Sequence, residues 1–179
     1  MKGVYERSKD FVGHLLGLAQ PGREDRAALA ALRSGLGQKP GASARMHKYV
    51  VPYLGERAHH SDCWFYAVGA LFAWHPQHEP RQSLGAGLGA LWGQEGQSDS
   101  VEVRFVTLLN SHPDDLPDHL RQAVGLLRSK EIGLDWFLLL RSLINWDHPD
   151  RRVQNQWARD FYRQERPEHD DAAAQAEVA

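Results

Sequence analysis

The sequence contains only one cysteine and no long apolar run, and these two features exclude several classes of protein. Cys63 alone can form no internal disulfide and no cysteine-based zinc site, as expected in the reducing cytoplasm. The apolar stretches at 63–74 and 136–140 are too short or too interrupted to span a bilayer, and the first residues lack the apolar core of a signal peptide. We therefore expect a cytoplasmic protein without a membrane partner, large enough at 179 residues to bury its own core.

The chain also lacks the excess of basic residues that is typical of a nucleic-acid-binding domain. Its formal net charge is −2, yet five of its 23 acidic residues and only one of its 21 basic residues lie between 165 and 179. Residues 1–164 therefore carry a net charge of about +2. We predict a disordered acidic tail at 167–179, because this segment has no apolar residue larger than valine to bury.

Strand patterns are missing as well, since no stretch alternates between apolar and polar residues for long. The apolar residues recur at helical spacing, which predicts an all-α fold of helical bundles with about eight to nine helices in two loosely divided halves. Helices are expected at 5–19, at 24–34, at 45–54 with a bend at Pro52, from a cap at Ser61 or Asp62 to Pro76, in the glycine-rich segment 83–93, from Asp99 with Glu102 in a capping box, at 118–130, at 134–146, and at 149–164 with Asp147 as N-cap.

The glycine-rich segment is the expected joint between the two halves. We predict an N-terminal helical subdomain at 1–93 and a C-terminal four-helix bundle at 94–166, because the later predicted helices have short connections.

Several cations lie beside the apolar face of a predicted helix. In the segment SVEVRFVTLLN, Arg104 lies at the edge of the face that contains Val101 and Leu108. Arg121 and Arg128 each follow a predicted core leucine and are seven residues apart, so both lie along one margin of their helix. Such arginines can pair with neighbouring carboxylates, or they can contact successive phosphate groups. The sequence leaves both alternatives open.

Five segments in their order resemble the CasB family, the small subunit of the type I-E CRISPR surveillance complex called Cascade. They are SLGAGLGALW, VEVRFVTLL, LRQAVGLLRS, LDWFLLLRSLINWD and VQNQWARDFYR, and the similarity extends over about 26–163. The resemblance implies an all-helical subunit that is not an enzyme and that pairs with a second copy of itself beside the backbone and large subunits. It also implies contact with the backbones of guide RNA and of target and displaced DNA. We expect no cofactor.

The resemblance further implies which cations form the basic surface. The positions that match the family's basic surface are Arg26, Arg33, Arg81, Arg104, Arg121 and Arg128. Lys130 and Arg141 are added from the helical pattern, because Lys130 ends one predicted helix and Arg141 lies within the apolar face of the next.

Aromatic residues could serve either as core or as platforms for unstacked bases. Trp136, Trp146, Trp157 and Phe161 recur at core spacing, so we expect them to be buried. Trp92, in the glycine-rich segment, is the candidate for an exposed ring.

Ten histidines raise the alternative of a metal-dependent hydrolase. The possible ligands are His59, His60, Asp62, His75 and His78. Their spacing argues against a metal site, because two of them lie in a loop broken by proline and no helical H-E-x-x-H pair is present. A helical adaptor that binds only proteins is the main alternative function.

Overall fold

The structure is a computed structural model that describes residues 3–163. Over this range it is all-helical, apart from an isolated bridge between His78 and Leu134, which confirms the predicted fold class. The described α-helices are α1 (Val4–Leu18), α2 (Arg26–Arg33), α3 (His47–Val50), α4 (Asp62–Trp74), α5 (Leu84–Gln94), α6 (Asp99–Leu109), α7 (Leu116–Ser129), α8 (Trp136–Ile144) and α9 (Arg152–Tyr162).

The predicted helix at 45–54 is divided into three short pieces. A 3-10 turn at Ala44–Met46 precedes α3, and a second 3-10 turn at Val51–Tyr53 follows it. Pro52 lies in that second turn, where its missing N–H and its ring prevent a continuous α-helix.

The capping box expected at Asp99 is wrong. Asp99 is already the first residue of α6, Ser98 is the N-cap, and Ser98 makes no capping hydrogen bond through its side chain. Glu102 instead accepts a hydrogen bond of 2.7 Å from the hydroxyl of Tyr162, which links α6 to the end of α9. The N-cap of α9 is Arg151 in a left-handed conformation (φ 50°), in place of Asp147.

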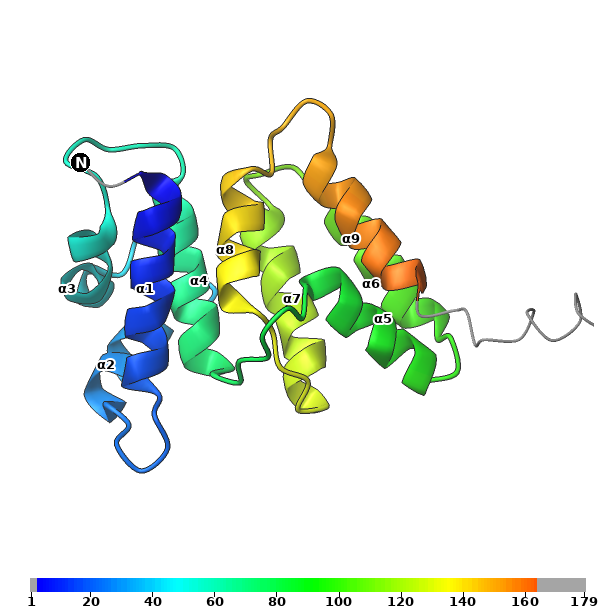
Figure 1. Ribbon diagram of the computed structural model, residues 1–179, viewed down its shortest axis with the longest axis horizontal. Coiled ribbons are helices and arrows are strands. Elements are labelled where there is room, and N and C mark those ends of the chain that lie inside the picture. The colour runs from blue at the N-terminus through cyan, green and yellow to red at the C-terminus, as the bar shows by residue number, and fades with distance from the viewer. Residues whose placement is uncertain (1–2, 164–179) are drawn as a thin grey trace, which may run out of the picture.

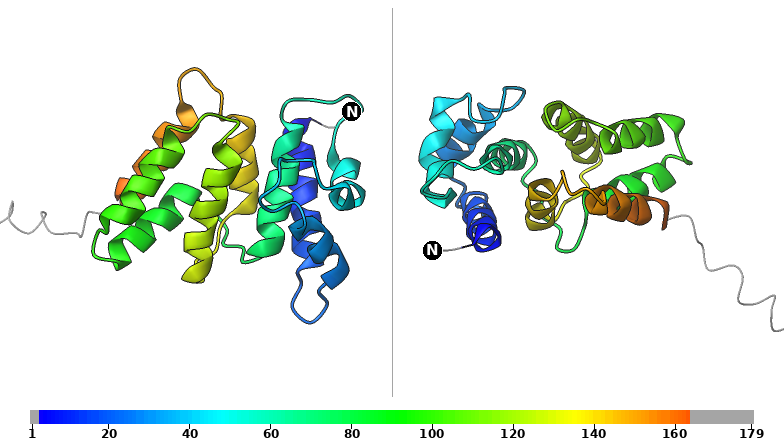
Figure 2. Two further views of the ribbon diagram at one scale, coloured as in Figure 1. Left: turned by 180° about the vertical axis from the view of Figure 1, so that it is seen from behind. Right: turned by 90° about the horizontal axis from the view of Figure 1, so that it is seen from above.

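The helices form two groups side by side, α8 lies between them (Figure 1), and α4 of the first group also contacts α7 of the second. Helices α1 to α4 make the first group, and α8 packs against α4 and α1. Helix α5 packs chiefly against α9 and also against α6 and α7, although the sequence grouped it with the N-terminal helices. Seen from above, α1, α8 and α9 lie on one side of the molecule, and α2, α3, α6 and α7 lie on the other (Figure 2). We call these the front and rear faces.

Aromatic residues fill the core of both groups. Phe72 packs edge-on against Trp136 at 5.6 Å between ring centroids, and Phe105 stacks on Phe161 at 4.1 Å. All four aromatic residues predicted as core are buried. Trp92 is buried too, at 5% exposure, because it stacks on Phe161. The expectation of an exposed Trp92 is therefore wrong.

Asp135 fixes the segment that leads into α8. Its carboxylate accepts hydrogen bonds of 3.0 Å from the N–H groups of Phe137 and Leu138, which caps the helix, and another of 2.8 Å from the N–H of Arg81. The N–H of Glu79 donates to the carbonyl of Leu134 as well. These bonds hold the segment before α5 against the start of α8, although 54 residues separate Arg81 from Asp135.

Candidate nucleic-acid interface

Arg121 and Arg128 project from one margin of α7, as the seven-residue spacing predicted. The guanidinium of Arg128 lies over the ring of Trp74, with its carbon 5.0 Å from the ring centroid, so a cation–π contact on α4 orients it. Arg121 lines a crevice together with the segment that follows α2. Its Nε lies 3.9 Å from a carboxylate oxygen of Asp118, too far for a hydrogen bond, and the side chain is 43% exposed. Such a pair contributes little to stability and leaves the guanidinium available.

Arg33 lies near Arg128 but has a structural role. Its Nε and Nη2 donate hydrogen bonds of 3.0 and 2.7 Å to the carbonyl of Ala73, in the last turn of α4. A cation at a helix C-terminus satisfies free carbonyl groups and favours the helix dipole. Since Trp74 is the next residue along the chain, Arg33 and Arg128 both act at this helix end.

Arg104 lies on the opposite side of α7 from Arg121. It lines a hollow of about 140 Å³ between α6 and α7 with His119 and Gln122, above an apolar floor that includes Phe105. Among the described residues, no side-chain hydrogen bond or close ion pair engages Arg104 or Arg26, and both residues are exposed. Backbone hydrogen bonds and, to a smaller extent, the charge of Arg26 lower the pKa of Glu24.

Lys130 is already paired. Its ammonium lies 3.2 Å from a carboxylate oxygen of Glu95 at the end of α5, which neutralises the cation and joins two chain segments. Five of the other predicted cations belong to α2, α6 and α7, which are helices of the rear face (Figure 2). We call these five residues the rear arginine surface: Arg26, Arg33, Arg104, Arg121 and Arg128.

Arg81 and Arg141 lie apart from this surface, at a hollow of the front face of about 530 Å³. The guanidinium carbon of Arg141 lies 5.8 Å from the ring centroid of Tyr5. A third arginine, Arg152 at the start of α9, lines the same hollow. Sequence reasoning missed Arg152 because its distance from Arg81 along the chain gives no sign that they meet. The signal available was its place in the first turn of a predicted helix, where a cation opposes the helix dipole.

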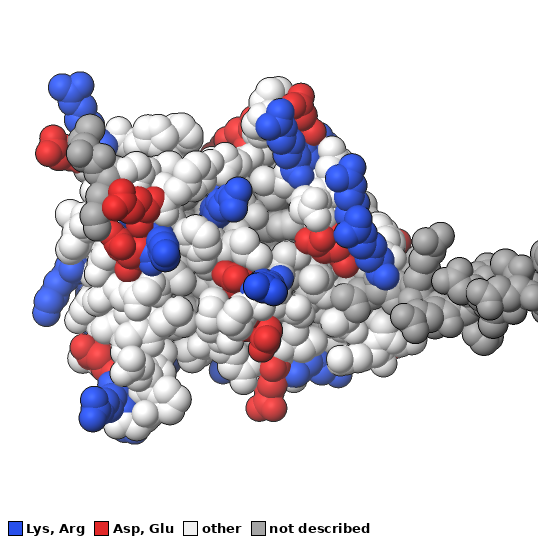
Figure 3. All heavy atoms as spheres, viewed as in Figure 1, with Lys and Arg blue, Asp and Glu red and all other residues white. Residues whose placement is uncertain are grey.

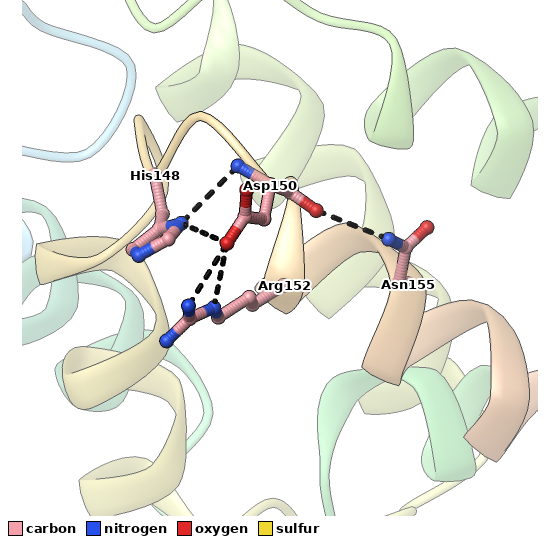
Figure 4. A network of polar contacts seen from close by, with 4 residues as sticks. All are labelled: His148, Asp150, Arg152 and Asn155. Carbon is pink, nitrogen blue, oxygen red and sulfur yellow. Dashed lines mark hydrogen bonds and ion pairs between the residues drawn. The ribbon is translucent and has the colours of Figure 1, made fainter.

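A polar network holds Arg152 in place (Figure 4). Its Nε and Nη2 donate to one carboxylate oxygen of Asp150 at 3.2 and 2.9 Å. The backbone N–H of Asp150 donates to Nδ1 of His148, and the side chain of Asn155 donates to the Asp150 carbonyl. Arg152 is 70% exposed, and Nη1 makes none of these bonds.

The residues considered for metal binding serve the turn before α4. Asp62 accepts a hydrogen bond from the N–H of His59, and Nδ1 of His59 lies 2.8 Å from the hydroxyl of Ser61. In residues 3–163 no three histidine, cysteine or acidic side chains are grouped so that they could hold a metal ion. Burial raises the pKa of the Cys63 thiol, which disfavours the reactive thiolate.

Comparison with known proteins decides the family. The family model described as CRISPR-associated protein Cse2 matches residues 28–162. This chain belongs to the Cse2 family. The match confirms the resemblance to CasB, another name under which solved relatives appear. A Cse2 protein of Thermus thermophilus is 40% identical over 144 residues, which cover 76% of this chain and 79% of that protein.

Solved structures of the family share the fold. The crystal structure of CasB from Thermus thermophilus has a TM-score of 0.73 and 37% identity, and the match covers 88% of this chain and 97% of that one. CasB of M. ruber has a TM-score of 0.74 at 30% identity, covering 96% of both chains. A chain of a structure described as a CRISPR RNA-guided surveillance complex has a TM-score of 0.77 at 29% identity, covering 97% of this Cse2 chain and 99% of its own. Within the described part of this chain, no helix is long and apolar enough to cross a membrane.

Proposed function

We propose that this Cse2-family chain is the non-catalytic small subunit of a cytoplasmic type I-E Cascade complex. In this role it pairs with a second copy of itself, lies beside the backbone and large subunits, and contacts nucleic-acid backbones without reading their sequence. Its ligands are the guide RNA and the target and displaced DNA strands. Membership of the family and the likeness to a surveillance-complex chain support this role.

The observation that carries the proposal is the state of the arginines on the rear face. Arg104 is exposed with no side-chain hydrogen bond or ion pair among the described residues, Arg26 is exposed with only a weak electrostatic interaction with Glu24, and Arg121 has only a distant partner. A cation paired only weakly within the protein can bind a phosphate without first breaking a strong internal contact. The rear arginine surface is therefore suited to a phosphate backbone.

Such contacts matter because strand exchange during RNA-guided recognition is nearly balanced in energy. Each phosphate contact adds a small, sequence-independent and salt-sensitive increment. A few arginines on a small subunit are then enough to favour the opened state of the DNA.

Salt-dependent binding tests the proposal. Fluorescence anisotropy with a labelled random-sequence single strand and duplex compares the wild type with the variant Arg104→Ala, Arg121→Ala, Arg128→Ala. Because each lost contact lowers the slope of log K against log salt by about 0.7 on single strands, we expect a slope shallower by about 2. A matched control replaces three exposed cations, Lys9 in α1, Arg57 in the loop before α4 and Arg159 in α9, none of which lies on a helix of the rear face or lines the front hollow. If the triple variant binds like this control, the rear arginine surface does not bind nucleic acid.

The adaptor alternative is supported by the internal contacts of Arg33 and Lys130, which are already occupied by Ala73 and Glu95. In that case the wild type would show no salt-sensitive binding, while the chain would still enter the complex.

A further inference from the structure

The hollow on the front face brings together arginines from three separate parts of the chain. Arg81 comes from the segment before α5, Arg141 from α8 and Arg152 from α9. Basic side chains lie over α8 and α9 on this face (Figure 3). At about 530 Å³, the hollow is within the range of about 300–1,000 Å³ in which proteins bind small ligands.

The charge that lines this hollow is positive. Asp160 is the one carboxylate among its lining residues in the described part of the chain, and its two oxygens accept hydrogen bonds from Ser83 and Gln156. Asp150 lies beside the hollow and neutralises part of the Arg152 charge. Among the residues that line the hollow, three guanidinium groups therefore face one carboxylate, while Asp150 and Asp135 lie outside the lining beside Arg152 and Arg81.

Two of the arginine side chains, those of Arg141 and Arg152, and the backbone of the third, Arg81, are held in position before any ligand binds. The backbone of Arg81 is fixed by its bond to Asp135, Arg141 lies over Tyr5, and Arg152 is held through Nε and Nη2 by Asp150. Binding then costs less side-chain entropy than it would for free surface arginines. The position of Tyr5 is itself fixed by its hydroxyl, which donates a hydrogen bond of 2.9 Å to the side chain of Asn145.

We propose that this front hollow is a second phosphate-binding site, which holds a stretch of single-stranded nucleic acid. The inference rests on the proposed function and extends it, because the chain would then hold two strands on opposite faces. None of the residues that line the hollow belongs to the rear arginine surface.

Only one feature favours a single strand over an acidic protein segment, because the planar guanidinium groups match carboxylate and phosphate oxygens alike. Tyr5, which is 47% exposed, adds an aromatic ring beside them, and cations next to aromatic rings are typical of sites for unpaired strands.

The test uses the full chain and a labelled oligothymidylate six nucleotides long. The front variant Arg81→Asn, Arg141→Gln, Arg152→Gln removes the three charges, with asparagine at Arg81 because that residue has a φ of 69°. A titration at protein concentrations above the dissociation constant measures the number of strands bound per chain. We expect two strands per wild-type chain and one strand per front-variant chain. In the wild type, the strand in the front hollow contributes a salt slope of about 2, from three contacts of about 0.7 each, and this contribution is absent in the front variant.

Controls separate this inference from the proposed function. Adding the front substitutions to the rear triple variant is expected to abolish its remaining strand, and replacing the same three residues by lysine is expected to retain most of the binding. If the front variant binds as many strands as the wild type with the same slope, the front site is refuted, whatever the rear variant does. If the rear variant alone is unchanged, the rear surface fails and the front site stands. If polyglutamate competes as well as the oligonucleotide, the hollow is a protein-docking site and the inference is wrong.

Discussion

The contact between α5 and α9 leads to a specific prediction at Gly85. A Cβ atom at this position would lie 2.8 Å from the Cα of Trp157 and 2.9 Å from its carbonyl carbon. Because these are backbone atoms, no side-chain rotation relieves the clash, and the overpacking cost falls near the upper end of about 1–3 kcal/mol. Alanine gains about 1 kcal/mol from helix propensity. We therefore expect Gly85→Ala to destabilise the protein by about 2 kcal/mol, which lowers Tm by about 4–8 °C for a chain of this size.

Gly93 in the same helix supplies the matched control. A Cβ at Gly93 would meet no atom within 4 Å, so Gly93→Ala is expected to raise stability by about 0.5–1 kcal/mol. Thermal unfolding followed by circular dichroism, together with urea titration, measures both variants. If Gly85→Ala is as stable as Gly93→Ala, the two helix backbones do not approach as closely as described, and the reasoning fails. Because Trp157 and Asp160 also line the front hollow, Gly85→Ala should weaken binding there as well.

Burial lowers the pKa of His75, so the unfolded chain takes up a proton at a higher pH than the folded protein does. The contribution of His75 to the free energy of unfolding is therefore complete above a pH of about 6.5 and is lost as the pH falls below that value. Urea titrations from pH 7.5 to 5 should show a smaller loss of stability for His75→Gln than for the wild type. The control variant His60→Gln should lose as much stability as the wild type. Asp135→Ala removes two capping bonds and a loop contact and should cost about 1–2 kcal/mol, more than Asp25→Ala at a cap with one bond, as measured by the same titration. Deletion of 167–179, which lie outside the described residues, should leave Tm unchanged in calorimetry, and a large loss would contradict the predicted acidic tail.

Much of the local structure follows from spacing along the sequence. The helical repeat of apolar residues predicts the helices, the burial of Trp136 and Phe161, and the common margin of Arg121 and Arg128. The predictions that failed depend on small energies or on distant residues. Helix α6 begins one residue earlier than the predicted capping box requires, with Ser98 in place of Asp99 as its N-cap. Trp92 is buried because it stacks on Phe161, which follows it by 69 residues in the sequence.

By itself, the sequence determined the helical class, the aromatic core and the likeness to CasB, because these depend on repeats and on the order of segments. Only the tertiary structure decided which cations are free. Arg33 and Lys130 are occupied by groups from other helices, whereas Arg81, Arg141 and Arg152 meet in one hollow. The physical reason is that a charge is neutralised or exposed by whatever lies within a few ångströms of it, and in a helical bundle those neighbours come from distant parts of the chain.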